Sequence, residues 1–236
     1  MEFFDLQPTL QWMFVPKKIP NCPPGLEYLA QINQLIVCQR FDLQDVIGNL
    51  ETSKAYEVMN NQGERIYFAE EKSNFFLQNL CGSSRPFTMT IYDNVGRDVI
   101  TIRKALRCHC CCINCSLQKL KVEAPPGETI GYVYQNFHPF LPTFKLKNEN
   151  KEDVMKIRGP CVISSCIRDL NFNLLSLDEE LVLGNVSKHC PGFVTGLLTD
   201  VDKFGIQFPF DLDVKIKALM LGASFLIDYM YFELWS

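Results

Sequence analysis

Three aspartates near the C-terminus have the residue type and part of the spacing of a calcium-binding loop. An EF-hand loop places acidic or amide side chains at positions 1, 3 and 5, glycine at position 6 and a bidentate glutamate at position 12. Counted from Asp200, the chain has Asp202 at position 3 and Asp211 at position 12. Gly205 occupies position 6, but position 5 is Phe204, whose side chain cannot ligate. We therefore expect a weak Ca²⁺ site, with a Kd of ~10⁻⁴ M or poorer.

The same segment has a second interpretation in which no ion is bound. Gly205–Phe210 would form a β-strand, and Asp211 and Asp213 would cap the helix expected after it. A capping carboxylate accepts free backbone N–H groups and is stabilised by the positive end of the helix dipole. Asp200 and Asp202 lie too far upstream for this capping, so cation ligation is their best functional interpretation.

A dense group of cysteines in the middle of the chain is a second chemical feature. Five of the 11 cysteines fall between Cys108 and Cys115, and basic residues flank them on both sides. This context favours S-palmitoylation. Two acyl chains, or one chain plus basic residues, convert marginal membrane binding into stable anchoring. The expected acylation sites are Cys110, Cys111, Cys112 and Cys115, and the expected membrane-facing basic residues are Arg103, Lys104, Arg107, Lys119 and Lys121.

The cysteines also allow a metal site. Cys110 and Cys115 would supply two soft ligands, with Cys161, Cys166 or His189 completing the set. Three adjacent cysteines suit one tetrahedral ion poorly, and no second Cys-x₂-Cys motif follows, so anchoring is favoured. The chain contains no Gly-x-Ser-x-Gly, P-loop or His-Glu-x-x-His sequence, and its three histidines have no evident nucleophile. Covalent catalysis is therefore not expected.

Composition limits the remaining classes of protein. With 47% hydrophobic residues the chain can bury a large core, and a net charge of −4 argues against a dedicated nucleic-acid binder. No secretory signal is visible, and an odd number of cysteines favours a reducing compartment. We expect a short N-terminal tail over residues 1–20, interrupted by prolines, and a single domain over residues 21–236.

Short alternating segments separated by turn residues dominate the chain from Asn21 to Lys188. They predict successive hairpins, hence a large antiparallel sheet whose closure into a barrel would remove its edges. The paired segments are Tyr56–Asn60 with Arg65–Ala69, Phe87–Tyr92 with Asp98–Arg103, Leu120–Glu123 with Thr129–Tyr134, Thr143–Lys147 with Asp153–Ile157, and Asn171–Leu175 with Leu181–Val186.

The last apolar segment breaks this pattern. Leu212–Leu234 has the length and composition of a helix without a clean polar face, so it must be buried all round. A membrane span would place Asp228 in the bilayer at a cost of about 2.5–3.5 kcal/mol, whereas a core helix could be wrapped by the barrel. The buried or membrane-embedded side chains include Leu219, Leu221, Phe225, Leu226 and Ile227.

Several motifs in one order resemble the phospholipid scramblases over about Asn21 to Glu233. They are Cys22-Pro-Pro-Gly-Leu-Glu-Tyr-Leu29, Ser84-Arg-Pro-Phe87, Ala124-Pro-Pro-Gly127, Gly159-Pro-Cys161, Asp200-x-Asp202-x-Phe204-Gly205-Ile-Gln-Phe-Pro209 and Asp211-Leu-Asp213-Val-Lys215. The resemblance implies a tubby-like fold, a closed antiparallel β-barrel around a buried hydrophobic C-terminal helix. It also implies calcium-stimulated, ATP-independent movement of phospholipids between leaflets and palmitoylation of the cysteine group.

The resemblance further implies partners and a location. The partners are membrane phospholipids, including the anionic inner leaflet, and the location is the cytoplasmic face of the plasma membrane. Longer members bind SH3 and WW domains through a Pro-rich N-terminal region, and 20 residues leave little room for it. Asn185 replaces a lysine of the family's nuclear-import element, which weakens the case for nuclear entry. The alternative function is a membrane-tethered lipid-binding or interaction module in which scrambling is indirect or absent.

Overall fold

The structure is a computed structural model that describes residues 11–40, 54–72, 85–107, 117–161, 171–189 and 203–232. Twelve strands form one closed barrel in which neighbours along the chain pair antiparallel, and β1 pairs with β12 to close the ring. The strands are β1 Gln34–Arg40, β2 Ala55–Met59, β3 Arg65–Lys72, β4 Phe87–Tyr92, β5 Asp98–Lys104, β6 Lys119–Glu123, β7 Thr129–Asn136, β8 Thr143–Asn148, β9 Asp153–Arg158, β10 Asn171–Leu175, β11 Val182–His189 and β12 Lys203–Gln207.

The five expected hairpins are all present, and the expected closure of the sheet is confirmed. Three of the turns use the same design, and in the β8–β9 turn Asn148 Oδ1 accepts the backbone N–H groups of residues 150 and 152 at 3.0 and 2.9 Å. Asn60 Oδ1 accepts the backbone N–H groups of residues 62 and 64 at 2.9 Å, and Asp93 Oδ1 accepts those of residues 95 and 97 at 3.0 and 2.9 Å. Gly63 and Gly96 follow with φ of 80° and 82°, a conformation that glycine adopts without steric cost.

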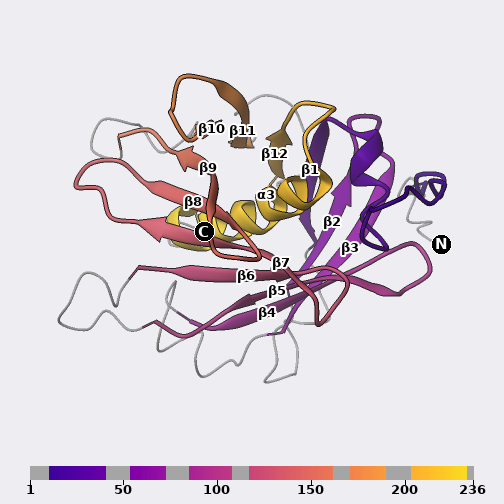
Figure 1. The fold of residues 1–236 in the computed structure, drawn as a ribbon. Coiled ribbons are helices and arrows are strands. Elements are labelled where there is room, and N and C mark those ends of the chain that lie inside the picture. Colours follow the sequence, from indigo (N-terminus) through magenta and orange to yellow (C-terminus); the bar gives the residue numbers. More distant parts are fainter. Residues whose placement is uncertain are drawn as a thin grey trace, which may run out of the picture.

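The barrel is filled by the C-terminal segment, as Figure 1 shows. The helix α3, Val214–Ile227, continues as the π-helical turn η3, Asp228–Phe232, which confirms the expected core helix. The side chains expected to be buried are all 2% exposed or less: Leu219, Leu221, Phe225, Leu226 and Ile227. Gly222 lies so close to the wall that an added Cβ would lie 3.0 Å from Val122 Cγ2. Among the described residues, no helix has the length and apolar character needed to cross a bilayer.

The barrel has two distinct ends. The hairpin-turn end carries the tight connections 60–64, 93–97, 124–128, 149–152 and 176–181, and α3 begins there. The 3₁₀ turn η1, Leu29–Gln31, also lies at this end, against α3. The long-loop end carries the connections after β1, β3, β5, β7, β9 and β11, and η3 lies there. Asp228, which is 7% exposed, is the first residue of η3 and so lies near this mouth of the barrel. A position near the mouth lowers the cost of burying its carboxylate.

At the hairpin-turn end, α3 is fixed by one buried lysine. The Lys217 ammonium donates to the backbone carbonyls of Leu29 and Ile32 at 2.9 Å each and of Phe210 at 2.8 Å. Asp213 caps the helix by accepting the N–H of Lys215 at 2.7 Å. The helix entrance is therefore satisfied mostly by backbone carbonyls from the segments before β1 and after β12.

At the long-loop end, the helix exit is fixed by side chains from two strands. The Tyr229 hydroxyl donates to one oxygen of Glu71, and Arg85 Nη2 pairs with the other at 3.3 Å. The Arg85 guanidinium lies 4.5 Å from the centre of the Tyr229 ring, and Phe87 stacks on that ring at 4.5 Å. Lys104 joins this cluster because its ammonium donates to Arg85 O at 2.7 Å.

Part of the expected N-terminal tail contacts the barrel. The N–H of Met13 donates to Arg65 O at 2.8 Å, and the N–H of Arg65 donates to Gln11 O at 2.9 Å. These bonds make a short parallel bridge beside the start of β3. The Arg65 guanidinium also lies 5.0 Å from the centre of the Trp12 ring.

Candidate functional site

The structure describes only part of the expected calcium site. Lys203–Gln207 form β12, the strand alternative for this segment, so the middle of the proposed loop is extended and spans ~13 Å. Asp200 and Asp202 precede the strand and lie outside the described residues, whereas Asp211 follows it at the hairpin-turn end. Among the described residues, no three His, Cys, Asp or Glu side chains gather as a metal site. Because two of the three aspartates lie outside the described residues, the expected calcium site is not tested, and calcium binding stays a prediction.

Asp211 and Asp213 have different roles at the helix entrance. Asp213, not Asp211, is the capping residue. Burial lowers the pKa of Lys217, and the negative charge of Asp211 opposes that shift. Asp211 therefore acts on the buried ammonium through its charge.

The expected acylation sites Cys110, Cys111, Cys112 and Cys115 lie outside the described residues, and of the proposed cysteine metal site only Cys161 and the backbone of His189 are described. The described chain stops at Arg107 before them and resumes at Leu117, both at the long-loop end. Leu106 is 45% exposed just before this segment. Acylation stays a prediction.

Four of the five expected membrane-facing basic residues are partly or fully exposed, and one is not. Lys104 is 3% exposed and lies in the buried cluster with Arg85, because side chains alternate along β5 and Arg103 takes the outward position. Arg103 faces outward opposite Lys121 on β6, and both pair with Glu123, at 3.5 and 2.7 Å. The prediction that Lys104 faces the membrane is therefore wrong. The expected strand ended at Arg103, so the sequence pattern did not show that Lys104 points inward.

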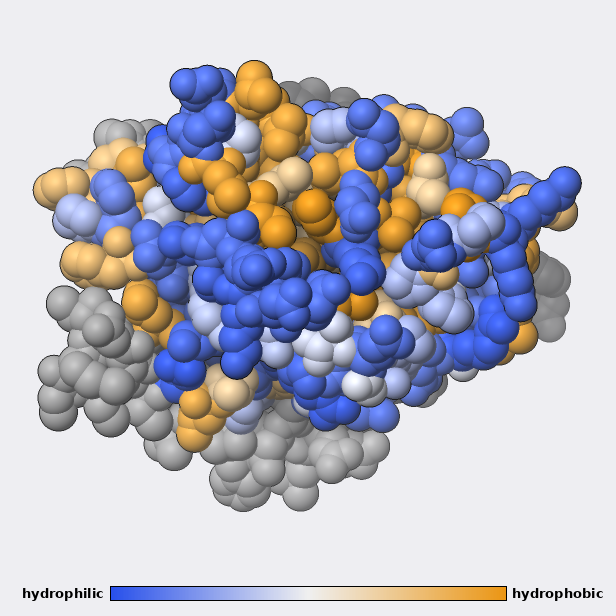
Figure 2. All heavy atoms as spheres, in the orientation of Figure 1, coloured by the Kyte–Doolittle hydropathy of each residue, from blue (hydrophilic) through white to orange (hydrophobic). Residues whose placement is uncertain are grey.

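The exposed cations belong to a larger surface that continues over β9. We call it the basic outer face and define it as the outward cations of β5, β6, β8 and β9: Arg103, Lys119, Lys121, Lys145, Lys147, Lys156 and Arg158. In the orientation of Figure 1, Figure 2 shows hydrophilic residues gathered over the middle of the molecule, in front of β6–β9. Sequence reasoning missed the β8–β9 half, although Lys-x-Lys in β8 and Lys-x-Arg in β9 carry the period-2 signal of outward cations.

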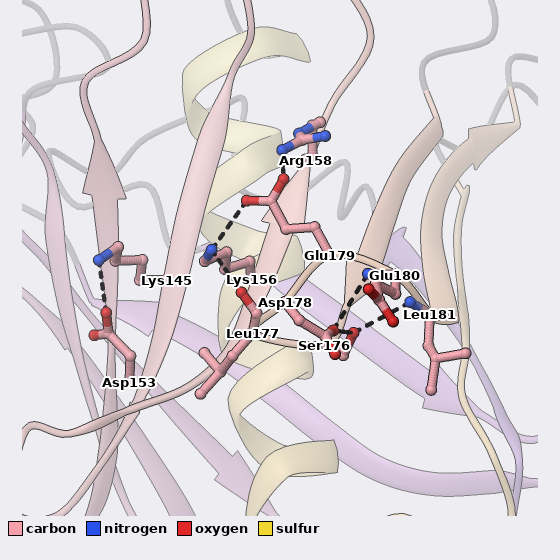
Figure 3. A network of polar contacts seen from close by, with 10 residues as sticks. All are labelled: Lys145, Asp153, Lys156, Arg158, Ser176, Leu177, Asp178, Glu179, Glu180 and Leu181. Carbon is pink, nitrogen blue, oxygen red and sulfur yellow. Dashed lines mark hydrogen bonds and ion pairs between the residues drawn. The ribbon is translucent and has the colours of Figure 1, made fainter.

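Carboxylates on this face are each shared between two cations. Glu123 pairs with Arg103 and Lys121, Asp153 with Lys145 and Lys147, and Glu179 with Lys156 and Arg158; Figure 3 shows the second and third groups in part. Burial acts to raise the pKa of Asp153, but the two lysines outweigh it and hold the pKa below its ordinary value. Hydrogen bonds from Lys156 and Arg158 likewise lower the pKa of Glu179. The carboxylates stay ionised near neutral pH, and the face keeps a surplus of positive charge.

Tyrosines accompany the cations on the same face. Tyr132 and Tyr134 meet edge to face at 5.9 Å between ring centres, and Lys119 Nζ lies 4.6 Å from the centre of the Tyr134 ring. The loop after β7 adds Phe137 and Phe140, 54% and 60% exposed, at the long-loop end. His138 between them has a structural role, because its Nδ1 accepts the N–H groups of Phe140 and Leu141 at 3.2 and 2.9 Å. Exposed aromatic and basic residues are typical of protein surfaces that meet a membrane interface.

Comparison with known proteins identifies the family. The family model described as Scramblase matches residues 13–234. Phospholipid scramblase 2 of Homo sapiens is 54% identical over 94% of this chain and 75% of its own length. Phospholipid scramblase 1 of Mus musculus is 55% identical over 94% of this chain and 68% of its own. Phospholipid scramblase 4 of Homo sapiens is 39% identical over 95% of this chain and 68% of its own length.

No solved structure matched the chain. The family match nevertheless covers nearly all of the barrel and its central helix, from the segment beside β3 to the end of η3. The chain belongs to the scramblase family.

Proposed function

We propose that this protein moves phospholipids between membrane leaflets, stimulated by calcium and without ATP, from the cytoplasmic face of the plasma membrane. The observation that carries the proposal is the basic outer face beside the cysteine segment, in a chain about 54% identical to proteins named phospholipid scramblases. Because α3 fills the barrel, lipids have no path through its interior among the described residues. Headgroups would instead meet the basic outer face, with Phe137 and Phe140 entering the interface.

The direct test is lipid transfer by the purified protein in liposomes that carry a fluorescent phospholipid on both leaflets. Loss of inner-leaflet fluorescence to an external quencher, faster with Ca²⁺ and unchanged by ATP, would support scrambling. A Phe137→Asp, Phe140→Asp double variant should slow the transfer, whereas Phe210→Asp, at an exposed phenylalanine of the hairpin-turn end, should not. Vesicle binding without transfer would instead support the membrane-tethered module, which the filled barrel favours.

Acylation of the cysteine segment is the proposed source of stable attachment. Each buried acyl CH₂ contributes ~0.8 kcal/mol, and each nearby basic residue about 1 kcal/mol against an anionic leaflet. Changing Cys111, Cys112 and Cys115 together to Ala should move the protein from membranes to cytosol. Cys22→Ala is the matched control, because burial, then Glu27 and Asp213, raise the pKa of that thiol to about 11 and leave it unreactive. If the triple variant still sediments with membranes at high salt, the anchor lies elsewhere.

Calcium binding is proposed to rest on Asp200, Asp202 and Asp211. Asp200→Ala should weaken Ca²⁺ binding in titration calorimetry and leave the calcium-free melting temperature nearly unchanged. Asp211→Ala should lower both the Ca²⁺ affinity and the calcium-free stability, because the charge of Asp211 also acts on Lys217. Wild-type Ca²⁺ affinity in the Asp200 variant would overturn this site.

A further inference from the structure

The strands β8 and β9 place two lysines directly opposite each other on the outside of the barrel. Lys145 on β8 is the register partner of Lys156 on β9, and Thr143 is the partner of Arg158. Like charges directly across an antiparallel pair are destabilising, because their Cβ atoms lie only ~5 Å apart. The two lysines therefore need negatively charged groups nearby, and two carboxylates supply them.

The two lysines that face each other turn to different carboxylates. Lys145 Nζ pairs with Asp153 at 2.6 Å, while Lys156 Nζ pairs with Glu179 at 3.0 Å and Arg158 binds the other oxygen of Glu179. Figure 3 shows the Glu179 carboxylate between Lys156 and Arg158, reaching over β9 from the β10–β11 turn. Four cations, counting Lys147, thus share two carboxylates and leave a surplus of two positive charges.

A cavity opens at this position. Its volume is about 290 Å³, near the lower limit of ~300 Å³ typical of small-ligand pockets. The charged residues that line it are Lys145, Lys156, Arg158 and Glu179, so three cations face one carboxylate. Of the acids nearby, Asp153 pairs with Lys145, and Asp178 accepts from the Ser176 hydroxyl and from the N–H of Glu180 at 3.2 Å.

Neutral donors and the backbone complete the lining. His138 lines the cavity, and since its Nδ1 accepts two backbone N–H groups, the proton of the neutral ring sits on Nε2 as a donor. Glu179 adopts φ of 65°, in the left-handed region that is uncommon for residues other than glycine. Its carboxylate occupies the position that an exogenous anion would take between Lys156 and Arg158.

We propose that this cavity binds a phosphomonoester group and that Glu179 is a built-in competitor that the ligand displaces. A phosphomonoester carries about −1.5 to −2 charges at pH 7 and three acceptor oxygens, which match the surplus charge and the lysine and arginine donors. The exposed loop that carries Phe137 and Phe140 borders the cavity through His138. A lipid headgroup therefore reaches the cavity if this end docks on a membrane, so the lipid source rests on the proposed function, whereas the anion chemistry does not.

The first arm of the test uses soluble ligands alone. Inorganic phosphate and glycerol 3-phosphate are titrated into the purified chain, its Glu179→Gln variant and its Glu152→Gln variant. Glu152 is the matched control, because it lies in the β8–β9 turn bonded to Asn148 and does not line the cavity. We expect Glu179→Gln to bind about tenfold more tightly, since a competing charged hydrogen bond is removed, and Glu152→Gln to bind as the natural chain does. Equal affinity in the two variants would overturn the proposal.

A second variant should weaken phosphate binding, in contrast to Glu179→Gln, which should strengthen it. Lys156→Gln with Arg158→Gln should weaken phosphate binding about tenfold or more, because two charge-assisted hydrogen bonds are lost. Lys151→Gln is the control, an exposed lysine of the same hairpin outside the cavity lining. Thermal melts of the four variants establish that they are folded, and unchanged affinity in a folded double variant would refute the cavity as the site.

The second arm identifies the source of the phosphate. Phosphatidylcholine vesicles carry either phosphatidic acid, a phosphomonoester lipid, or phosphatidylserine at matched surface charge. Preferential sedimentation with phosphatidic acid, enhanced in Glu179→Gln but not in Glu152→Gln, would assign a lipid headgroup. Soluble binding without that preference would assign a free phosphomonoester and retain the site. Loss of leaflet transfer in liposomes with intact phosphate binding would contradict the proposed function alone.

Discussion

The two ends of the barrel hold the same helix by different means. At the hairpin-turn end, the Lys217 side chain is wholly buried, and the backbone carbonyls of three residues accept hydrogen bonds from its ammonium group. At the long-loop end, Tyr229 is held by Glu71 and Arg85, which come from β3 and the segment before β4. Backbone acceptors tolerate changes of neighbouring side chains, whereas a side-chain cluster links the helix exit to the strands that carry the long loops. Substitutions in the strands that carry the long loops should therefore affect the helix exit more than the helix entrance.

The largest expected effect is at the hairpin-turn end. Lys217→Met removes three hydrogen bonds and leaves two buried carbonyls and one partly buried carbonyl without this donor, which should lower the free energy of unfolding by about 3–5 kcal/mol. Chemical denaturation of the detergent-free protein measures it. Lys215→Met is the control, because Lys215 makes only a half-exposed 3.6 Å pair with Glu149 and should change stability by less than ~1 kcal/mol. Equal stability of the two variants would mean that the entrance is not fixed as described.

The helix middle tests the packing between the two ends. Gly222→Leu places a side chain where even a Cβ would lie 3.0 Å from Val122 and 3.2 Å from Leu120, so we expect a loss of about 1–3 kcal/mol. Thermal melts in the absence of detergent provide the measurement. An unchanged melting temperature would contradict a helix enclosed by the barrel wall.

The long-loop end should respond to alkaline pH. Burial, followed by the charges of Tyr56 and Glu71, raises the pKa of Tyr229 well above its ordinary value. The folded state keeps this proton while the unfolded state loses it above ~10, so its contribution to stability is complete below that pH and declines above it. Tyr229→Phe should reduce the alkaline loss of stability, measured by denaturation from pH 8 to 11. An alkaline slope in Tyr229→Phe that equals that of the natural chain would refute the assignment.

The smallest effect distinguishes two aspartates at the helix entrance. Asp213→Ala removes the cap of Lys215 N and should cost about 1 kcal/mol. Asp211→Ala removes a charge that favours the protonated Lys217 but no capping bond, so the loss should be smaller. Thermal melts without calcium compare the stability of the two variants. A larger loss of stability in Asp211→Ala than in Asp213→Ala would indicate that Asp211 is the cap.

Local patterns predicted most of the fold. Each hairpin is encoded by alternating residues and a turn, and the apolar character of Ala218–Phe232 on all sides required burial. The strand β1 was not predicted, because its pairing with β12 joins distant segments and no tight turn marks it. The buried lysines were not predicted either: the interior position of Lys104 depends on strand phase, and that of Lys217 on carbonyls contributed by η1 and the turn after β12.

The part of the candidate site that is contiguous in sequence was predicted, and the part that depends on strand pairing was not. The basic flanks of the cysteine segment are contiguous in sequence, so they were found as a charge cluster. Lys145, Lys156 and Glu179 come from three strands and turns, and only the register of β8 with β9 brings them together. The spacing of Asp200, Asp202 and Asp211 predicts one site, and a sequence count does not show that β12 extends between Asp202 and Asp211; since Asp200 and Asp202 lie outside the described residues, that site stays a prediction.

The central claim is that the C-terminal segment is the core of the barrel and that the membrane meets the outside of the molecule. Amide hydrogen exchange, resolved along the chain, tests it most directly in the free protein and on anionic vesicles. We predict that Val214–Ile227 is among the slowest-exchanging segments in both states, while the 137–142 loop becomes protected only on vesicles. Rapid exchange of Val214–Ile227 in the free protein, with protection appearing only in the presence of membrane, would contradict the claim.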